Sequence, residues 1–480
     1  MKASALGMRR MIGVWQRLGT RFLPFADAAS PDLPLSRLLR LSLFQVSVGM
    51  AAVLLTGTLN RVMILELGVP TSLVALMVAI PVLAAPFRVL IGHRSDTYVS
   101  ALGWRRVPYI WFGTLLQFGG LAFMPFALLL LQSQTLGPEW AGPVAAAFAF
   151  LLTGLGMHMA QTAGLALATD LAAEQTRPRV VALVYVMLLV GMIVASLAFG
   201  WLLADFSPMR LIQVVQGAAV VTVALNVVAL WKQEARRPHA TRAGRAVQGF
   251  GEAFAAYRGN AQVTRFLVGV GLGSAAFSMQ DVLLEPFGGE ILGLSVSQTT
   301  LLTAMWAGGT LAGFALAGRL LHRGMNMHRM AALGALVGVF AFAAVIFSGA
   351  LGSATLFRAG TLAIGFGGGL FAVGTMLAAM ELAERTDAGF AIGAFSAVQA
   401  TAIGLGLAIG GVLRDVVNAV AATGALGEAL QTPSTGYAVV YNVEIVLLFL
   451  SLAVLGPLAG KRFGGDRDGL RQFGLADLPG

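Results

Sequence analysis

The sequence contains no cysteine and few charged residues. The absence of cysteine excludes disulfides, thiolate metal sites and thioether-linked haem. Only 11% of the 480 residues are charged, whereas 57% are hydrophobic, and the mean hydropathy is +0.81. A soluble globule of this composition could not bury its apolar surface, so we expect the chain to lie in a lipid bilayer.

Apolar runs of about 20 residues, the length that crosses a bilayer as an α-helix, recur along the whole chain. They predict an all-α membrane protein with twelve transmembrane helices. The expected spans are 39–67, 71–92, 107–131, 141–168, 180–204, 211–231, 263–288, 297–321, 329–350, 355–383, 389–414 and 437–459. Because the number is even, both termini lie on the same side of the membrane.

Basic residues divide unequally between the segments that join these spans, as the positive-inside rule describes. With both termini in the cytoplasm, most Lys and Arg residues fall in the cytoplasmic tails, inner loops and central linker. The outer side then holds only Arg61, Arg210, Arg358 and Arg414. Membrane topology therefore explains the sequence pI of about 10.7, and we expect no nucleic-acid partner.

The two halves of the sequence are related. Residues 59–63 (LNRVM) align with residues 279–283 (MQDVL), and Gly92 aligns with Gly318. Two parallel six-helix repeats are the arrangement of the major facilitator fold. The predicted regions are a basic cytoplasmic tail with an interfacial amphipathic helix on anionic lipids (1–38), an N-terminal six-helix bundle (39–231), a cytoplasmic linker (232–262), a C-terminal six-helix bundle (263–459) and a cytoplasmic tail (460–480).

Ionisable residues inside a span are costly and are functional candidates. Asp281 and Glu285 lie one turn apart in the seventh span. Two carboxylates placed so closely repel each other, so one of them could carry a proton. Alternatively both pair with Arg61, which the repeat places at the equivalent depth of the first span. We favour an ion cluster of Arg61, Asp281 and Glu285 that joins the halves, with proton coupling as the alternative.

Candidate ligand-binding residues lie on the first, fourth and seventh spans. His158, Gln161 and Thr162 share one face of the fourth span, and His158 is the only histidine inside a span. Its neutral imidazole could ligate the magnesium of a tetrapyrrole or donate a hydrogen bond to a neighbouring helix. Asn60 and Gln280 are the candidates with oxygen lone pairs on the first and seventh spans.

The loop between the second and third spans contains a candidate inner gate. Gly92 and Asp96 are followed by Arg105 and Arg106, as in major facilitators. The gap between Asp96 and Gly103 is longer than usual, so the sequence does not decide whether this loop forms a gate. The sequence carries no metalloprotease, P-loop, catalytic-triad or kinase signature. We therefore expect no enzyme, no catalytic residue and no metal bound directly by the protein.

Several stretches carry a family resemblance: residues 59–69 (LNRVMILELGV), 92–96 (GHRSD), 103–120 (GWRRVPYIWFGTLLQFGG), 168–183 and 279–294 (MQDVLLEPFGGEILGL). They resemble the bacteriochlorophyll delivery family, the PucC and LhaA branch of the major facilitator superfamily, and the resemblance runs from about residue 38 to 460.

The resemblance implies an assembly factor of the bacterial cytoplasmic or intracytoplasmic photosynthetic membrane. Such a protein binds or delivers bacteriochlorophyll to light-harvesting antenna polypeptides, and the reaction-centre antenna is favoured. Further implied partners are the reaction centre and pigment-biosynthesis enzymes; carotenoid binding is left open. Two alternatives remain: a proton-coupled exporter or flippase of a tetrapyrrole or other amphiphile, and a pigment-free assembly scaffold.

Overall fold

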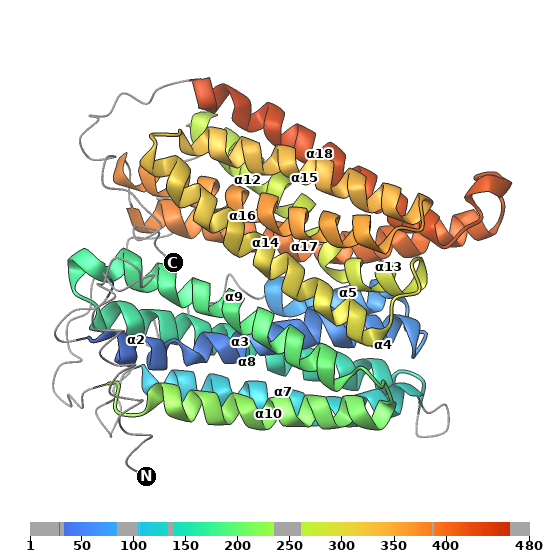
Figure 1. The fold of residues 1–480 in the computed structure, drawn as a ribbon, viewed down its shortest axis with the longest axis horizontal. Helices are drawn as coiled ribbons and strands as arrows, with labels where there is room; N and C mark the ends of the chain where they lie inside the picture. Colours follow the sequence, from blue (N-terminus) through green and yellow to red (C-terminus); the bar gives the residue numbers. More distant parts are fainter. Residues whose placement is uncertain are drawn as a thin grey trace, which may run out of the picture.

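The computed structural model describes residues 28, 33–83, 104, 106–132, 138–234, 261–385 and 388–460. The described residues are helical apart from short turns, and they contain no strand, which confirms the predicted all-α class. The amphipathic helix predicted within residues 1–38 and the C-terminal tail lie outside these ranges, as does most of the central linker. Figure 1 shows the helices packed side by side along a common direction.

The helices of the first half follow the predicted spans closely. They are α2 (Leu35–Leu41), α3 (Leu43–Ala52), η3 (Val53–Thr58), α4 (Leu59–Leu65), α5 (Thr71–Leu83), α7 (Val107–Gln132), α8 (Ala141–Leu171), α9 (Arg177–Leu202) and α10 (Pro208–Leu230).

The helices of the second half are α12 (Ala261–Met279), η6 (Gln280–Val282), α13 (Leu284–Glu290), α14 (Val296–His322), α15 (Met327–Ala350), α16 (Ala354–Arg385), α17 (Ala388–Ala422) and α18 (Ser434–Gly460). Eleven segments of the described chain are long and apolar enough to cross a membrane, and the shorter α5 occupies the place of the second predicted span. The chain is therefore a multi-pass membrane protein.

Helix α17 is longer than the sequence indicates, because it ends at Ala422 and not at residue 414. The apolar run stops at Arg414 and Asp415, but neither charge ends the helix. Arg414 pairs with Glu290 at 2.6 Å and with Asp415 at 3.0 Å, so both charges are neutralised where they lie. The additional turns extend beyond the neighbouring helices in Figure 1.

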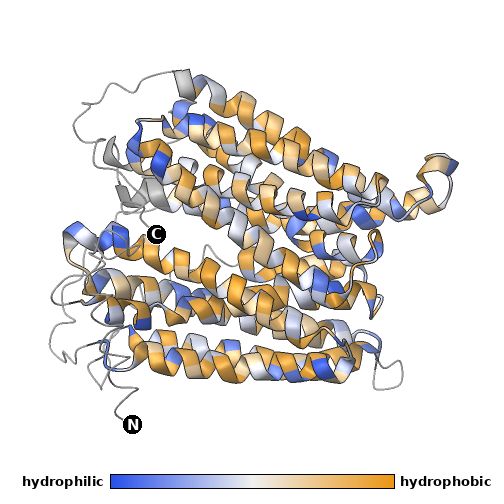
Figure 2. Cartoon of the chain, viewed as in Figure 1, coloured by the Kyte–Doolittle hydropathy of each residue, from blue (hydrophilic) through white to orange (hydrophobic). Residues whose placement is uncertain are grey.

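The two ends of the helix bundle differ in what they contain. The start of α2 and the end of α18 lie at the same end, which we call the terminal end (Figure 1). The opposite end, called the distal end, contains the turns between α4 and α5, α9 and α10, and α13 and α14. Apolar residues cover most of the helix lengths, whereas hydrophilic residues gather mainly toward the two ends (Figure 2).

Glycines allow α14, α15 and α16 to approach each other closely. A Cβ atom on Gly313 would lie 2.6 Å from the carbonyl oxygen of Phe366, and one on Gly334 would lie 2.5 Å from that of Gly367. These distances are too short for a side chain, so the three helices pack backbone against backbone. Their positions in the C-terminal half are thereby fixed.

The two halves meet mainly where α9 packs on α14, where α5 packs on α17, and where the first span meets the seventh; η3 also contacts α14, and α5 contacts η6. Six hydrogen bonds between described residues join the halves, and these six lie toward the distal end. This interface places the residues of the candidate site.

Candidate functional site

The first and seventh spans both lose regular α-helical geometry, at neighbouring points of the repeat. The first span contains the π-helical segment η3 (Val53–Thr58), and the seventh contains the 3-10 turn η6 (Gln280–Val282) before α13. Irregular helical segments often mark functional sites, because they free backbone groups for other partners. We call the meeting point of these segments the junction; it contains Asn60, Arg61, Gln280, Asp281 and Glu285.

Asn60 connects the halves at the junction. Its fully buried amide nitrogen donates to the carbonyl oxygens of Thr56 at 3.0 Å and Val282 at 2.8 Å. A second connection lies beside it, where the hydroxyls of Thr58 and Thr300 are 3.1 Å apart. Neutral hydrogen bonds therefore join the first span to the seventh and eighth spans here.

Arg61 pairs with Glu66 and not with the carboxylates named from the sequence. The distance between Nη1 of Arg61 and Oε1 of Glu66 is 2.6 Å, and the described residues contain no ion pair from Arg61 to Asp281 or Glu285. Glu66 follows five residues later, and its side chain is 40% exposed. Pairing there costs less desolvation than joining two fully buried charges, so Glu66 is the ion-pair partner in place of the two predicted carboxylates. Glu285 still interacts electrostatically with Arg61.

Glu285 lies in a pocket built by both halves. One of its oxygens accepts a hydrogen bond from the hydroxyl of Thr303 at 2.6 Å, and the other is buried without a hydrogen-bond partner. Gly57 faces this carboxylate so closely that a Cβ atom there would overlap it. In the reverse direction, Gly289 faces the guanidinium group of Arg61. Each half thus provides a glycine that makes room for the charged side chain of the other half.

Asp281 accepts a hydrogen bond from the uncharged amide of Gln280 on the 3-10 turn. The amide nitrogen of Gln280 donates to Asp281 and to the carbonyl oxygen of Phe277. A third carboxyl, Glu444 on α18, interacts electrostatically with Asp281, and both Glu444 oxygens are buried without a hydrogen-bond partner. Sequence reasoning did not place Glu444 at the site, although a carboxyl inside an apolar span is itself a signal.

The candidates on α8 form a separate group. His158, Gln161 and Thr162 are partly buried, and the hydroxyl of Thr162 donates to the carbonyl oxygen of His158 at 2.8 Å. The recorded hydrogen bonds of Asn60 and Gln280 go to the first and seventh spans and not to α8. The hydrogen bond donated by Thr162 thus stays within α8, whereas those donated by Asn60 and Gln280 lie in the junction.

Of the predicted inner gate, Arg106 alone lies within the described ranges; Gly92, Asp96 and Arg105 lie outside them. The guanidinium group of Arg106 pairs with Asp170 at 3.1 Å. Its backbone N–H donates to the carboxylate of Glu234, which thereby caps the N-terminus of α7. Both acids belong to the first half of the chain, so these bonds join neighbouring helices of that half.

A polar contact at the distal end joins α5 to α17. The carboxylate of Asp415 accepts from the backbone N–H of Ser72 at 2.7 Å, and Arg414 donates to the hydroxyl of Thr71 at 3.1 Å. The N-terminus of α5 is therefore capped by a residue of the other half. Sequence reasoning missed this contact because its partners are 343 residues apart.

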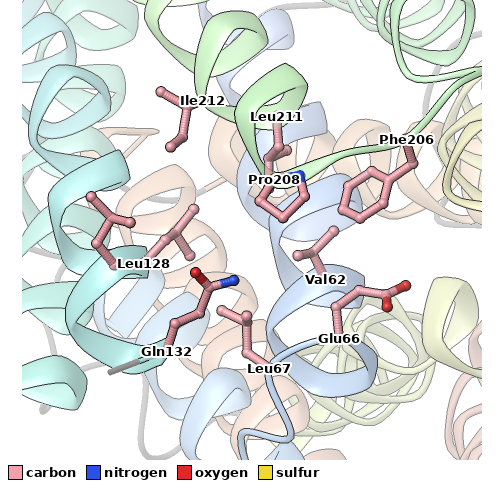
Figure 3. Close-up of a pocket in the computed structure, with 10 residues that line it drawn as sticks. Val62, Glu66, Leu67, Leu128, Gln132, Phe206, Pro208, Leu211 and Ile212 are labelled. Carbon is pink, nitrogen blue, oxygen red and sulfur yellow. The ribbon is translucent and has the colours of Figure 1, made fainter. Parts of the chain in front are cut away.

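A small cavity of about 40 Å³ borders the Arg61–Glu66 pair (Figure 3). Figure 3 shows the Glu66 carboxylate and the Gln132 amide beside it, with Val62, Phe206 and Leu211 around them. This volume suffices for a few water molecules and is far too small for a pigment. The cavity can keep the exposed oxygen of Glu66 hydrated.

Comparison with known proteins identifies the family. The family model described as "PUCC protein" matches residues 58–463. A Rhodobacter capsulatus protein described as an uncharacterized protein in the puhA-bchM intergenic region is 57% identical over 477 residues, covering 98% of this chain and 99% of that protein. Protein PucC of Rhodovulum sulfidophilum is 57% identical over 408 residues, covering 83% of this chain and 89% of that protein.

Among solved structures, a bacterial homologue of the human lysosomal transporter Spinster, in an inward-facing and unoccupied conformation, has a TM-score of 0.66 at 15% sequence identity. The match covers 88% of this chain and 96% of that one. At this identity the likeness shows the fold alone, and it confirms the predicted major facilitator fold. Together with the family match, it confirms the resemblance found in the sequence: the chain belongs to the PucC protein family.

Proposed function

We propose that this protein is an assembly factor for a bacterial light-harvesting complex, and that it binds bacteriochlorophyll and delivers it to antenna polypeptides. The reaction-centre antenna is the favoured recipient, with the reaction centre and pigment-biosynthesis enzymes as further partners. The observation that carries the proposal is the family match over residues 58–463. No enzymatic reaction is part of this proposal.

The proposed setting is the bacterial cytoplasmic or intracytoplasmic photosynthetic membrane, with the terminal end in the cytoplasm. The excess of Lys and Arg in the tails and in the segments at that end supports this orientation. The distal end then faces the periplasm. The hydrogen bonds between the halves lie on that side.

The hydrogen bonds of the candidate residues suggest different tasks for the two groups. Asn60 uses its amide N–H group to join the halves, and Gln280 uses its own within the seventh span, so we assign both to the structure of the junction. His158 and Gln161 lie partly buried on α8. We therefore assign the pigment contact to the α8 group, with the imidazole of His158 as the candidate magnesium ligand.

One observation favours a second function, the proton-coupled export or flipping of a tetrapyrrole or other amphiphile. Asp281, Glu285 and Glu444 are carboxyls within spans, and none has a cationic ion-pair partner among the described residues. Carboxyls in such places commonly belong to proton relays. A pigment-free scaffold is the third candidate, and it requires no ligand site.

The first test is an absorption spectrum of the protein purified in mild detergent from its pigment-producing host. We expect about one bacteriochlorophyll per protein, lost in His158→Ala and retained in Thr169→Val. Thr169→Val is the matched control, because its hydroxyl is bonded within α8 and Thr169 is not among the candidate residues. Pigment retained in a folded His158→Ala variant would move the site elsewhere. Pigment-free protein that still binds antenna polypeptides would favour the scaffold.

A further inference from the structure

A large apolar groove lies on the N-terminal half, between α3, α9 and α10. Its volume is about 480 Å³, which is within the usual range for small-molecule sites. Val194, Val221 and Ala198 on its rim are exposed, so the groove opens toward the lipid. It is lined by Val46, Met50, Gly191, Val194, Ala195, Ala198, Phe199, Leu202, Arg210, Gln213, Val214, Gly217, Ala218, Val221 and Leu225.

The groove has the length of one lipid leaflet. It runs along α10 from Arg210 in the first turn to Leu225, which is about 22 Å at 1.5 Å per residue. Half the thickness of a bilayer with its headgroups is about 20–22 Å. An amphiphile in this groove would therefore reach from the distal membrane surface to the middle of the bilayer.

Polar side chains occur at one end of the groove only. Arg210 and Gln213 are the two polar residues in its lining, and both lie at the distal end of α10. Arg210 is exposed and has no ion pair within the described part of the chain. The groove thus combines a cation at the membrane surface with an apolar trough below it. An anionic headgroup with an apolar tail matches this arrangement.

The surrounding side chains leave the apolar part of the groove unfilled beside Gly217. A Cβ atom on Gly217 would meet no atom within 4 Å, although Gly217 lies in the lining. By contrast, Gly191 on the groove floor lies directly against the backbone of Val46, so α3 and α9 are closely packed there. The floor is closed, whereas the space beside Gly217 is open to an acyl chain.

We propose that this groove binds one phospholipid of the distal leaflet, with its phosphate at Arg210 and one acyl chain beside Gly217. A magnesium-bearing pigment fits less well, because the lining contains no imidazole or carboxylate and one amide. The lipid would support the contact between the halves, since the distal end of α9 packs on α14. There the hydroxyl of Ser297 donates to the carbonyl oxygen of Gly200 at 2.6 Å.

The test is native mass spectrometry of detergent-purified full-length protein titrated with phosphatidylglycerol or phosphatidylcholine. We expect one phosphatidylglycerol to bind in preference to phosphatidylcholine, and Gly217→Phe to weaken its binding by about tenfold, or about 1.4 kcal/mol. Gly119→Phe on α7 is the matched control, because a Cβ atom there also meets no atom within 4 Å. Arg210→Gln should abolish the preference for phosphatidylglycerol and leave the groove open.

A second measurement uses the melting temperature in detergent. Phosphatidylglycerol should raise it for the unmodified protein and for Gly119→Phe, and not for Gly217→Phe. If Gly217→Phe does not fold, Arg210→Gln still decides the question. The proposal is overturned if the two phenylalanine variants bind the lipid equally, or if Arg210→Gln keeps the preference for phosphatidylglycerol. It is also overturned if Gly217→Phe displaces bacteriochlorophyll or an antenna helix but does not displace lipid. None of these outcomes depends on pigment binding elsewhere.

Discussion

The first and seventh spans occupy equivalent places in the two halves, yet their charged side chains have different kinds of partner. In the first span, Arg61 pairs with Glu66 near the distal surface. In the seventh, Asp281 and Glu285 accept hydrogen bonds from the neutral donors Gln280 and Thr303. The contact here therefore depends on hydrogen bonds and on fit, with Arg61 donating to the carbonyl oxygen of Leu294 at 3.3 Å, and no ion pair crosses it in the described residues.

This difference separates structural residues from functional candidates. A pair between a buried arginine and a half-exposed glutamate keeps part of its hydration, so it can hold a cation near the membrane surface at low cost. Carboxyls without a cationic partner inside a span have no such explanation and are functional candidates. The seventh span, together with Glu444 on α18, is where a proton-dependent activity would reside.

The largest expected effect comes from filling the space that the first span leaves for the seventh. Gly57→Leu would force a side chain into the carboxylate of Glu285 and should lower the free energy of unfolding by about 3 kcal/mol. Gly308→Leu on α14 is the control, because a Cβ atom there meets no atom within 4 Å. Thermal melting in detergent measures both. Equal melting temperatures would show that the spans are not in close contact.

The next effect comes from the hydrogen bond that crosses the junction. Asn60→Ala leaves the buried carbonyl oxygen of Val282 without its donor, and should cost about 2 kcal/mol of stability. Asn226→Ala is not a suitable control, because Asn226 is itself bonded within a buried network. Thr162→Val is suitable, since its hydroxyl bonds only within α8. An Asn60→Ala variant as stable as Thr162→Val would contradict the crossing bond.

A smaller effect distinguishes the observed partner of Arg61 from the one that the sequence suggested. In a double-mutant cycle, Arg61→Ala and Glu66→Ala should show a coupling of about 1 kcal/mol, which salt weakens because Glu66 is half exposed. The cycle of Arg61→Ala with Asp281→Ala should show almost none. A larger coupling to Asp281 would restore the ion cluster across the halves.

The smallest effect on stability is expected for neutral replacement of the carboxyls. Glu285→Gln keeps the volume and the oxygen that accepts from Thr303. Its free energy of unfolding should therefore change by about 0.5 kcal/mol or less, and its melting temperature should change little. Pigment content should also be unchanged if the protein delivers pigment without proton coupling. Loss of antenna assembly in a folded Glu285→Gln variant would instead support the exporter.

Hydrophobic runs and basic loops predicted the spans well, because lipid demands long apolar helices whatever their packing. The repeat likewise predicted that Arg61 and Asp281 lie on corresponding helices. The partner of Arg61 could not be predicted, because Glu66 and Glu285 differ in exposure, which arises only from packing. The cap on α5 by Asp415 was equally hidden, since it joins residues far apart in sequence.

The position of His158 illustrates a different limit. Its residue type and its place in an apolar span made it a candidate, and the structure adds that it is partly buried and bonded. Neither observation distinguishes a magnesium ligand from a packing histidine. That distinction is chemical and requires the pigment itself.

The most direct test of the central proposal is pigment transfer in detergent. Purified protein carrying bacteriochlorophyll is mixed with pigment-free antenna polypeptides, and the antenna absorption band is followed over time. We predict that the band grows as pigment leaves the protein, and that His158→Ala, prepared without pigment, gives none. Stable retention of the pigment, or antenna formation at the same rate from free pigment, would contradict delivery.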